Sequence, residues 1–153
     1  MTNNNLPKIK IVIGADHAGF SLKEKIKEFL IKENYKVIDE GTFSKNSCDY
    51  PDIAEKVAKK VNTEKVDFGI LFCGTGVGMS IAANKIKGIR AAHCQDTVTA
   101  YFSRAHNNAN ILTLGARILG EELVLEIIKV FLNTKFEKGR HLKRVEKIKR
   151  LED

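Results

Sequence analysis

Short apolar runs alternate along the chain with longer stretches in which apolar residues recur every three or four positions. The runs are rich in β-branched residues, which favour strands, and few polar residues interrupt them. Five such runs stand out, at residues 8–13, 36–39, 68–72, 89–94 and 111–114. Strands that are apolar on both faces are typical of a parallel sheet covered by helices on each side.

The stretches between the runs predict helices, because residues three and four apart lie on one helical face. They cover residues 21–30, 51–61, 79–86, 97–105, 121–132 and 140–151. Ser21 and Glu24 have the spacing of a capping box at the start of the first helix, and Gly88 is expected to end the third. The alternation predicts an α/β fold, a three-layer sandwich in which helices cover both faces of a five-stranded parallel sheet. Residues 1–153 are expected to form one domain.

The last predicted helix has no strand after it, yet it carries an apolar stripe of Leu142, Val145, Ile148 and Leu151. An apolar helical face needs another apolar surface to cover it. We therefore expect this C-terminal helix to pack on a partner subunit and the protein to be a homodimer. Whether such dimers pair into tetramers stays open.

The formal net charge is +7, and eight lysine or arginine residues lie between Lys135 and Arg150. A basic chain favours anionic partners, which leaves nucleic acids, membranes and phosphorylated metabolites open. No apolar stretch approaches the ~20 residues that cross a bilayer. The polar start, residues 1–5, lacks the charged and apolar regions of a signal peptide, so the expected location is the cytoplasm.

Three cysteines, Cys48, Cys73 and Cys94, form no CxxC pair, and the four histidines show no metal-ligand spacing. The sequence therefore indicates neither a disulfide framework nor a metal site, and reduced thiols fit a cytosolic protein. Cys48 and Cys94 are expected to be structural.

A glycine-rich segment, Cys73-Gly74-Thr75-Gly76-Val77-Gly78, follows the third apolar run. Glycines leave backbone N–H groups uncovered, so such a loop can hold an anion, and a cysteine beside these dipoles can act as a base or nucleophile. The plainer alternative is that Cys73 is a small core residue and that Thr75 bonds its own backbone. The spacing G-x-G-x-G is a weak dinucleotide signal, and the Gly-Lys-Ser/Thr of a P-loop does not follow it.

Three further segments carry polar groups. Asp16 and His17 follow the first strand and can bind hydroxyls or relay protons; alternatively, Asp16 caps the next helix and His17 lies on the surface. The donor-rich run 106–110 (HNNAN) also suits a helix end and turn. Because it precedes a strand, it can join a site at the carboxyl ends of the strands only if the chain folds back or a second subunit supplies it. Arg140 and Arg144 lie one helical turn apart and match a phosphate, or else form a solvated basic face.

Together these segments closely resemble one family, the type B ribose-5-phosphate isomerases with their galactose-6-phosphate isomerase relatives. The shared motifs run in order over nearly the whole chain: 14–19 (GADHAG), 49–51 (DYP), 73–78 (CGTGVG), 84–91 (NKIKGIRA), 106–110 (HNNAN) and 139–144 (GRHLKR). The resemblance implies a doubly wound, Rossmann-like three-layer α/β fold and a homodimer with active sites at the interface. It also implies interconversion of D-ribose 5-phosphate and D-ribulose 5-phosphate, a step of the non-oxidative pentose phosphate pathway, without a metal or an organic cofactor.

In this family, the cysteine that matches Cys73 is the base that moves a proton between C1 and C2 through a cis-enediolate. The histidine that matches His106 assists ring opening, with Thr75 nearby. The arginines bind substrate largely through its phosphate, and some reach in from the other subunit. The positions that match substrate contacts, including the N–H groups that hold the enediolate oxygens, are Asp16, His17, Gly74, Thr75, Gly76, Val77, Gly78, Asn107, Arg117, Arg140 and Arg144.

Some family members use a glutamate from another loop as the base; because Cys73 is present, we expect the cysteine version. Galactose-6-phosphate isomerases divide these motifs between two different subunits, whereas this chain keeps them together, which favours the pentose substrate. The alternative is a six-carbon sugar phosphate, allose 6-phosphate or galactose 6-phosphate. Two other hypotheses are a nucleotide-binding redox or regulatory module, which predicts a bound nucleotide, and a nucleic-acid-binding protein, which predicts a steep salt dependence. The resemblance favours neither, and we expect no nucleic-acid or membrane partner.

Overall fold

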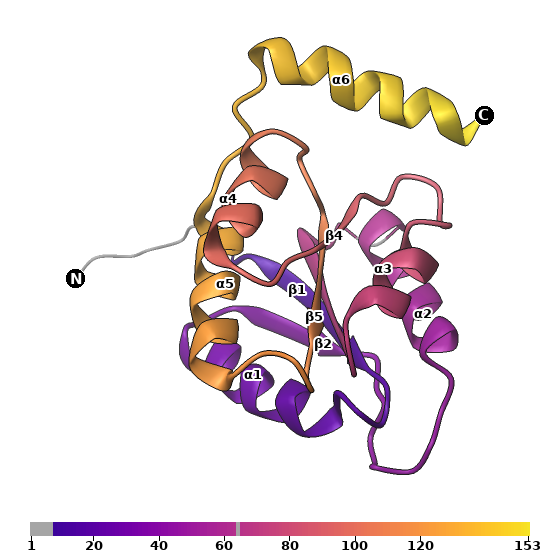
Figure 1. Cartoon of the computed structure of the whole chain (residues 1–153), viewed down its shortest axis with the longest axis vertical. Helices are drawn as coiled ribbons and strands as arrows, with labels where there is room; N and C mark the ends of the chain where they lie inside the picture. The colour runs from indigo at the N-terminus through magenta and orange to yellow at the C-terminus, as the bar shows by residue number, and fades with distance from the viewer. Residues whose placement is uncertain (1–7, 64) are drawn as a thin grey trace.

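The computed structural model describes residues 8–63 and 65–153, and the polar start at residues 1–5 lies outside them. Its strands are β1 (Lys10–Ala15), β2 (Lys36–Asp39), β3 (Phe68–Cys73), β4 (Ala91–His93) and β5 (Ile111–Gly115). They form one parallel sheet, seen in Figure 1, and their order in it is β2-β1-β3-β5-β4. The predicted parallel α/β architecture is therefore confirmed.

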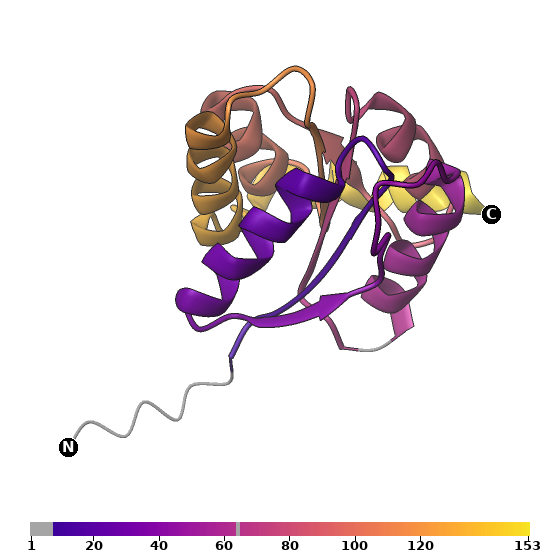
Figure 2. The same cartoon turned by 90° about the horizontal axis from the view of Figure 1, so that it is seen from below.

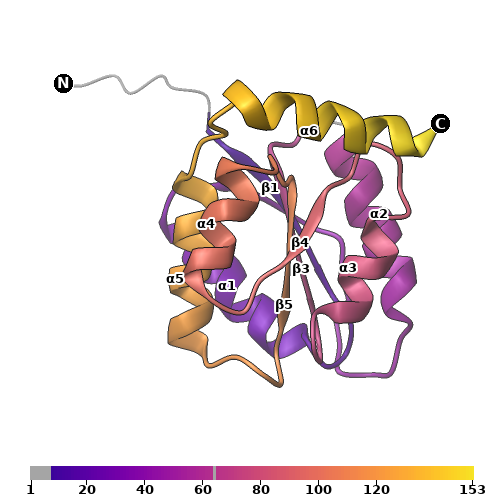
Figure 3. The ribbon, with the colours of Figure 1, turned by 45° about the horizontal axis from the view of Figure 1, so that its top comes forward.

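Helices cover both faces of this sheet. They are α1 (Phe20–Lys32), α2 (Tyr50–Thr63), α3 (Val77–Ala83), α4 (Thr97–Ala105), α5 (Glu121–Asn133) and α6 (Gly139–Lys149), with a short 3-10 turn, η1 (Arg150–Glu152). Helices α1, α4 and α5 lie on one face and α2 and α3 on the other (Figure 2). Helix α6 crosses one end of the sheet instead of a face (Figure 3). Among the described residues, no helix has both the length and the apolar character to cross a bilayer.

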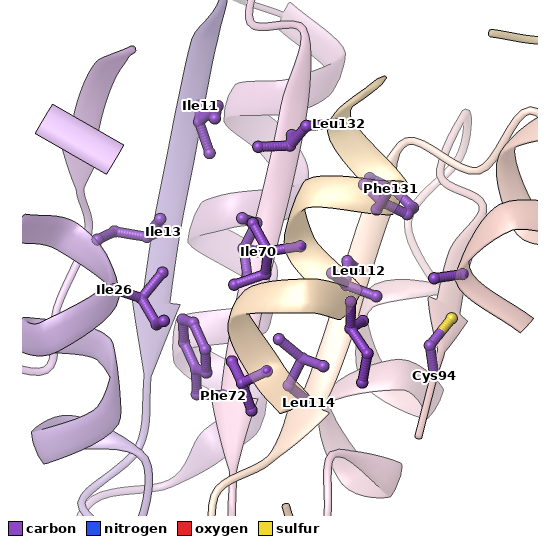
Figure 4. Packing of buried hydrophobic residues seen from close by; sticks show 14 of the residues in the cluster. Ile11, Ile13, Ile26, Ile70, Phe72, Cys94, Leu112, Leu114, Phe131 and Leu132 are labelled. Carbon is purple, nitrogen blue, oxygen red and sulfur yellow. The ribbon is translucent and has the colours of Figure 1, made fainter. Parts of the chain in front are cut away.

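The alternation of side chains along the strands divides the core into two layers. Ile70 and Phe72 of β3 pack with residues of α1 and α5 (Figure 4), whereas Leu71 and Cys73 pack with α2 and α3. Successive side chains of a strand point to opposite faces. The apolar run of β3 therefore determines that the Cys73 thiol lies on the side of the sheet from which α3 leaves.

The predicted capping box is wrong. Helix α1 begins before Ser21, at an N-terminus where Gly19 makes no side-chain cap. The turn ahead of it is closed by Asp16, whose Oδ1 accepts the N–H groups of Ala18 (3.0 Å) and Gly19 (3.1 Å). Glycine is required at position 19, because a Cβ there would lie 2.6 Å from the carbonyl oxygen of Phe72. The short distance between the β1–α1 turn and β3 thus decides the start of this helix.

The third helix and the fourth strand are both shorter than predicted. Helix α3 ends at Ala83, and β4 comprises only three residues. The amide of Asn84 donates to the carbonyl of Ala91 (2.9 Å) and accepts its N–H (2.8 Å), so the helix end is tied directly to the strand. Gly88, with φ +83°, turns the chain between them. Hydrogen bonds between the Asn84 side chain and Ala91, seven residues later, thus stand where the sequence predicted the last turn of the helix.

Candidate active site

The strand order makes the centre of the sheet, between β1 and β3, the point where the chain switches direction. These strands are neighbours, and the chain leaves them toward opposite faces, through α1 and α3. Such a divergence opens a binding crevice at the carboxyl ends of parallel strands. The two loops meet there, because the N–H of Asp16 donates to the carbonyl of Phe72 at 3.1 Å. The structure therefore brings Asp16 and His17 beside the segment that begins at Cys73.

The glycine loop folds back over the Cys73 side chain, which is 4% exposed. The N–H of Gly76 donates to Cys73 Sγ at 3.1 Å, and the N–H of Val77 donates to Thr75 Oγ1 at 3.3 Å. Thr75 thus bonds its own loop, as its plainer alternative predicted, and its hydroxyl proton remains a donor. Gly76 has φ +80°, and a Cβ there would lie 2.7 Å from His93 Nδ1. This conformation, which glycine alone adopts freely, aims the N–H at the sulfur.

The β5–α5 loop packs against the glycine loop. The N–H groups of Ala116 and Arg117 donate to the carbonyls of Cys73 (2.8 Å) and Gly74 (3.0 Å). The Arg117 side chain returns over the loop, with Nη1 3.4 Å from the position that a Cβ at Gly74 would occupy. Arg117 therefore places a cation beside the glycine loop, where an anionic group of a ligand would be stabilised.

His17 is oriented by a loop for which no element was predicted. Its Nδ1 accepts the N–H of Cys48 at 3.3 Å, so a neutral His17 ring carries its proton on Nε2. The loop is held to β1 by two backbone bonds of 2.7 Å, which join Ala15 to Gly41 and Thr42. Cys48 thus acts through its backbone N–H, consistent with the structural role expected for it.

The other predicted site residues lie at the opposite end of the sheet. Strand β5 runs from Ile111 to Gly115, and Gly115 is paired with Cys73. At about 3.3 Å per residue, the segment that precedes β5 is about 13 Å or more from the thiol. His106 and Asn107 lie in that segment, and α6, with Arg140 and Arg144, crosses the same end (Figure 3). The chain does not fold back, so the predicted site residues of one copy lie in two separate groups, one at the Cys73 end of the sheet and one at the α6 end.

The group at the α6 end contains two stacked imidazoles. The rings of His106 and His141 lie 4.0 Å apart at an interplanar angle of 12°, and both Nε2 atoms are 3.6 Å from Glu137 Oε2. Loss of solvent around the ring lowers the pKa of His141, and the neighbouring His106 and Arg140 lower it further. Sequence reasoning assigned no role to His141, although it lies within the GRHLKR motif, and missed Glu137, which precedes the motif without any periodic signal.

Two of the three asparagines in the run 106–110 have structural roles. Asn108 adopts φ +49° at the end of α4, and its Oδ1 accepts from the buried Arg104 at 3.0 Å. Asn110 Oδ1 accepts the N–H of Arg90 at 2.8 Å. The plainer interpretation, a helix end and turn, is therefore confirmed for these positions. Asn107, beside His106, is exposed.

Comparison with known proteins agrees with this architecture. The family model described as Ribose/Galactose Isomerase matches residues 11–148. Ribose-5-phosphate isomerase B of Escherichia coli is 48% identical over 143 residues, covering 94% of this chain and 96% of that protein. Galactose-6-phosphate isomerase subunit LacA of Streptococcus pneumoniae is 42% identical over 143 residues, covering 94% of this chain and 99% of that protein.

Solved structures are similar over the same length. Ribose-5-phosphate isomerase B of Clostridium thermocellum has a TM-score of 0.93 at 51% identity, covering 94% of this chain and 97% of that one. The Mycoplasma genitalium ribose-5-phosphate isomerase B with bound ribulose-5-phosphate has a TM-score of 0.90 at 42% identity, covering 94% and 96%.

Proposed function

The chain belongs to the ribose/galactose isomerase family, and on that premise we propose that it is a ribose-5-phosphate isomerase, which interconverts D-ribose 5-phosphate and D-ribulose 5-phosphate. The observation that carries the proposal is the Cys73 thiol beneath the glycine loop, with the N–H of Gly76 3.1 Å from its sulfur. Isomerisation needs a base next to a carbonyl and fixed donors for the charge that develops on oxygen. A thiol and backbone N–H groups in one loop supply both parts.

The proposed reaction proceeds in two proton-transfer stages. His106 first moves a proton from the anomeric hydroxyl to the ring oxygen, so the ring C1–O bond breaks and the C1 aldehyde forms. The Cys73 thiolate then removes the C2 proton of the open aldose to give the cis-enediolate. A proton passes from O2 to O1, and the Cys73 thiol returns its proton to C1, which leaves the carbonyl at C2. Preorganised donors at such an oxyanion typically contribute about 3 kcal/mol each. The N–H groups of residues 74–78 and the Thr75 hydroxyl are the proposed donors.

The substrate phosphate does not react, and its binding energy holds the sugar in line with the base. Arg117 is the proposed phosphate contact beside the glycine loop, and Arg140 and Arg144 are the proposed contacts from α6. Asp16, His17 and Asn107 are the proposed contacts to the sugar. Asp16 Oδ1 already accepts the two N–H groups that close the turn before α1. Its other oxygen, Oδ2, is the proposed acceptor for a hydroxyl of the sugar.

We propose that the two separate groups of site residues are half-sites of one active site, and their separation supports a homodimer with shared active sites. A two-fold arrangement would bring the α6 end of one copy to the Cys73 end of the other, twice. The α6 end also carries uncovered apolar surface: Leu151 is 84% exposed, and it lines a hollow of about 460 Å³ with Ile148 and Asn107. We further propose that residues 1–153 act as one isomerase domain in the cytoplasm, a reducing location supported by the three free cysteines.

The first test is the formation of ribulose 5-phosphate from ribose 5-phosphate in the presence of EDTA. Cys73→Ala should abolish turnover while its circular dichroism stays that of the wild type. Cys94→Ala removes the same atom from another buried thiol and is the matched control, with turnover retained. Near-normal turnover in Cys73→Ala would refute the assigned base. Turnover of galactose 6-phosphate or allose 6-phosphate, but not of ribose 5-phosphate, would assign the six-carbon substrate instead.

A mixing experiment tests the shared site directly. Cys73→Ala and His106→Ala are each inactive in the proposed mechanism, but half of randomly exchanged dimers contain one of each chain. If each site takes Cys73 from one copy and His106 from the other, these mixed dimers hold one intact site. Mixing should therefore restore about a quarter of the wild-type activity. If the mixture stayed inactive while subunits exchanged, the two half-sites would not belong to one active site.

A further inference from the structure

Three potential metal ligands converge at the α6 end of the sheet. His106 Nε2 and His141 Nε2 each lie 3.6 Å from Glu137 Oε2, and the ligand atoms of all three lie within 4.8 Å of one another. A good N–H···O hydrogen bond spans about 2.7–3.2 Å, so 3.6 Å is too long for one. The imidazoles and the carboxylate are therefore held near one another at a spacing that direct hydrogen bonding does not explain.

This spacing suits an ion placed between the three groups. Zinc binds imidazole nitrogen and carboxylate oxygen at about 2.0–2.2 Å in a tetrahedron, which puts two ligand atoms about 3.4 Å apart. Two imidazoles and one carboxylate form a donor set used in zinc sites with an open fourth position. We infer that His106, Glu137 and His141 form a binding site for a divalent transition-metal ion of the zinc class.

The backbone holds the ligands in place. The N–H of Glu137 donates to the carbonyl of Ala105 at 3.0 Å, which fixes the α5–α6 connection beside His106. The Tyr101 hydroxyl lies 3.4 Å from Glu137 Oε1, so Oε2 is the oxygen left facing the imidazoles. Such outer contacts orient ligands in metal sites.

One adjustment is needed for binding. The His106 and His141 rings are stacked at 12°, so their nitrogen lone pairs run side by side. The His141 side chain is buried, at 7% exposure, whereas that of His106 is 31% exposed. We expect His106 to turn about its Cβ–Cγ bond, a torsion with a broad energy minimum, and to aim Nε2 at the ion.

The functional consequence rests on the proposed function, in which His106 opens the sugar ring. An imidazole nitrogen bound to a metal cannot exchange a proton, so the ion should inhibit the isomerase. Arg140 and Arg144 on the same helix oppose a cation. We therefore expect binding of moderate strength that chelators reverse.

The site is tested with Co²⁺ as a spectroscopic probe, titrated into the full chain and followed by visible absorption, with Zn²⁺ as the competitor. We expect one ion per chain, and at least tenfold weaker binding in Glu137→Gln and in His141→Ala. Glu137→Gln is isosteric at a half-exposed position, so it keeps the fold. Glu146→Gln is the matched control, because it makes the same charge change on an exposed side chain of α6 that pairs with Lys149 (3.1 Å).

Absence of Co²⁺ binding would overturn the inference, as would equal binding in the wild type and both ligand variants. A thiolate charge-transfer band would assign the ion to a cysteine and overturn it as well. The titration needs no turnover, so its result is independent of the proposed function. If the chain is active, Zn²⁺ should inhibit the wild type reversibly with EDTA and should inhibit Glu137→Gln at least tenfold less effectively.

Discussion

Gly76 turns the loop that covers Cys73, and replacing it with alanine perturbs fold and chemistry together. Its φ of +80° costs an L-residue about 1–2 kcal/mol. The added Cβ would also lie 2.7 Å from His93 Nδ1 and 2.8 Å from the backbone carbon of Leu114. The ring can turn, but the backbone of a buried strand cannot move cheaply, and overpacking of this kind costs about 1–3 kcal/mol. The two contributions add to about 2–5 kcal/mol.

Denaturant unfolding and thermal melting measure this loss. We expect Gly76→Ala to fold, because small domains are stable by about 5–15 kcal/mol, but with a Tm lowered by roughly 4–20 °C. Turnover of ribose 5-phosphate should fall by about 100-fold or more, because the N–H aimed at the Cys73 sulfur moves with the loop. The proposed mechanism therefore predicts a loss of kcat that exceeds any loss of substrate affinity.

Two other glycines separate the contributions. Gly139 has φ +51° with open space around its Cβ position, so Gly139→Ala should lower the unfolding free energy only by the cost of the backbone conformation, about 1–2 kcal/mol. Gly120 has open space and φ −72°, so Gly120→Ala should change stability by less than about 1 kcal/mol. If Gly76→Ala were as stable as Gly139→Ala, the steric reasoning would be wrong. If it were also fully active, the glycine loop would not position the base.

Three further predictions concern a buried ion pair and the phosphate contacts. Asp39 lies 2.6 Å from the Nζ of the fully buried Lys23, which keeps Glu24 at 2.8 Å as a second carboxylate partner. Asp39→Asn should therefore lower the unfolding free energy by about 1.5–3 kcal/mol in denaturant titrations, and no measurable loss would contradict a stabilising Lys23–Asp39 pair. Burial alone would raise the pKa of Asp39, but hydrogen bonds from Lys23 and Lys27 outweigh it and hold that pKa below its usual value. Its stabilisation is therefore complete above about pH 4 and is lost as pH falls through the lower folded-state pKa, so Tm measured against pH should fall less steeply in acid for Asp39→Asn than for the wild type. Parallel curves would show that another group dominates acid unfolding. Arg140→Ala should raise the KM for ribose 5-phosphate at least tenfold with a smaller change in kcat, and an unchanged KM would remove Arg140 from the phosphate site.

The hydrophobic pattern by itself determined most of the elements. The strand at 36–39 and the helix at 97–105 have the predicted bounds, and the other strands and helices overlap their predictions. Periodicity and turn residues act between neighbours in sequence, so they need no knowledge of the rest of the fold. The same local information put the Cys73 thiol at a strand end, under a glycine loop, at the edge where ligands bind in such sheets.

Only the tertiary structure decided the order of the strands and the division of the site. Parallel strands buried on both faces look alike in sequence, so nothing local indicates that β5 lies between β3 and β4. The start of α1 follows from the approach of Gly19 to β3, a contact across more than fifty residues. The stacking of His106 on His141, with Glu137 beside both, depends on where α6 crosses the sheet. Such contacts join residues far apart in the chain, and only the packing of the whole fold sets the distances between them.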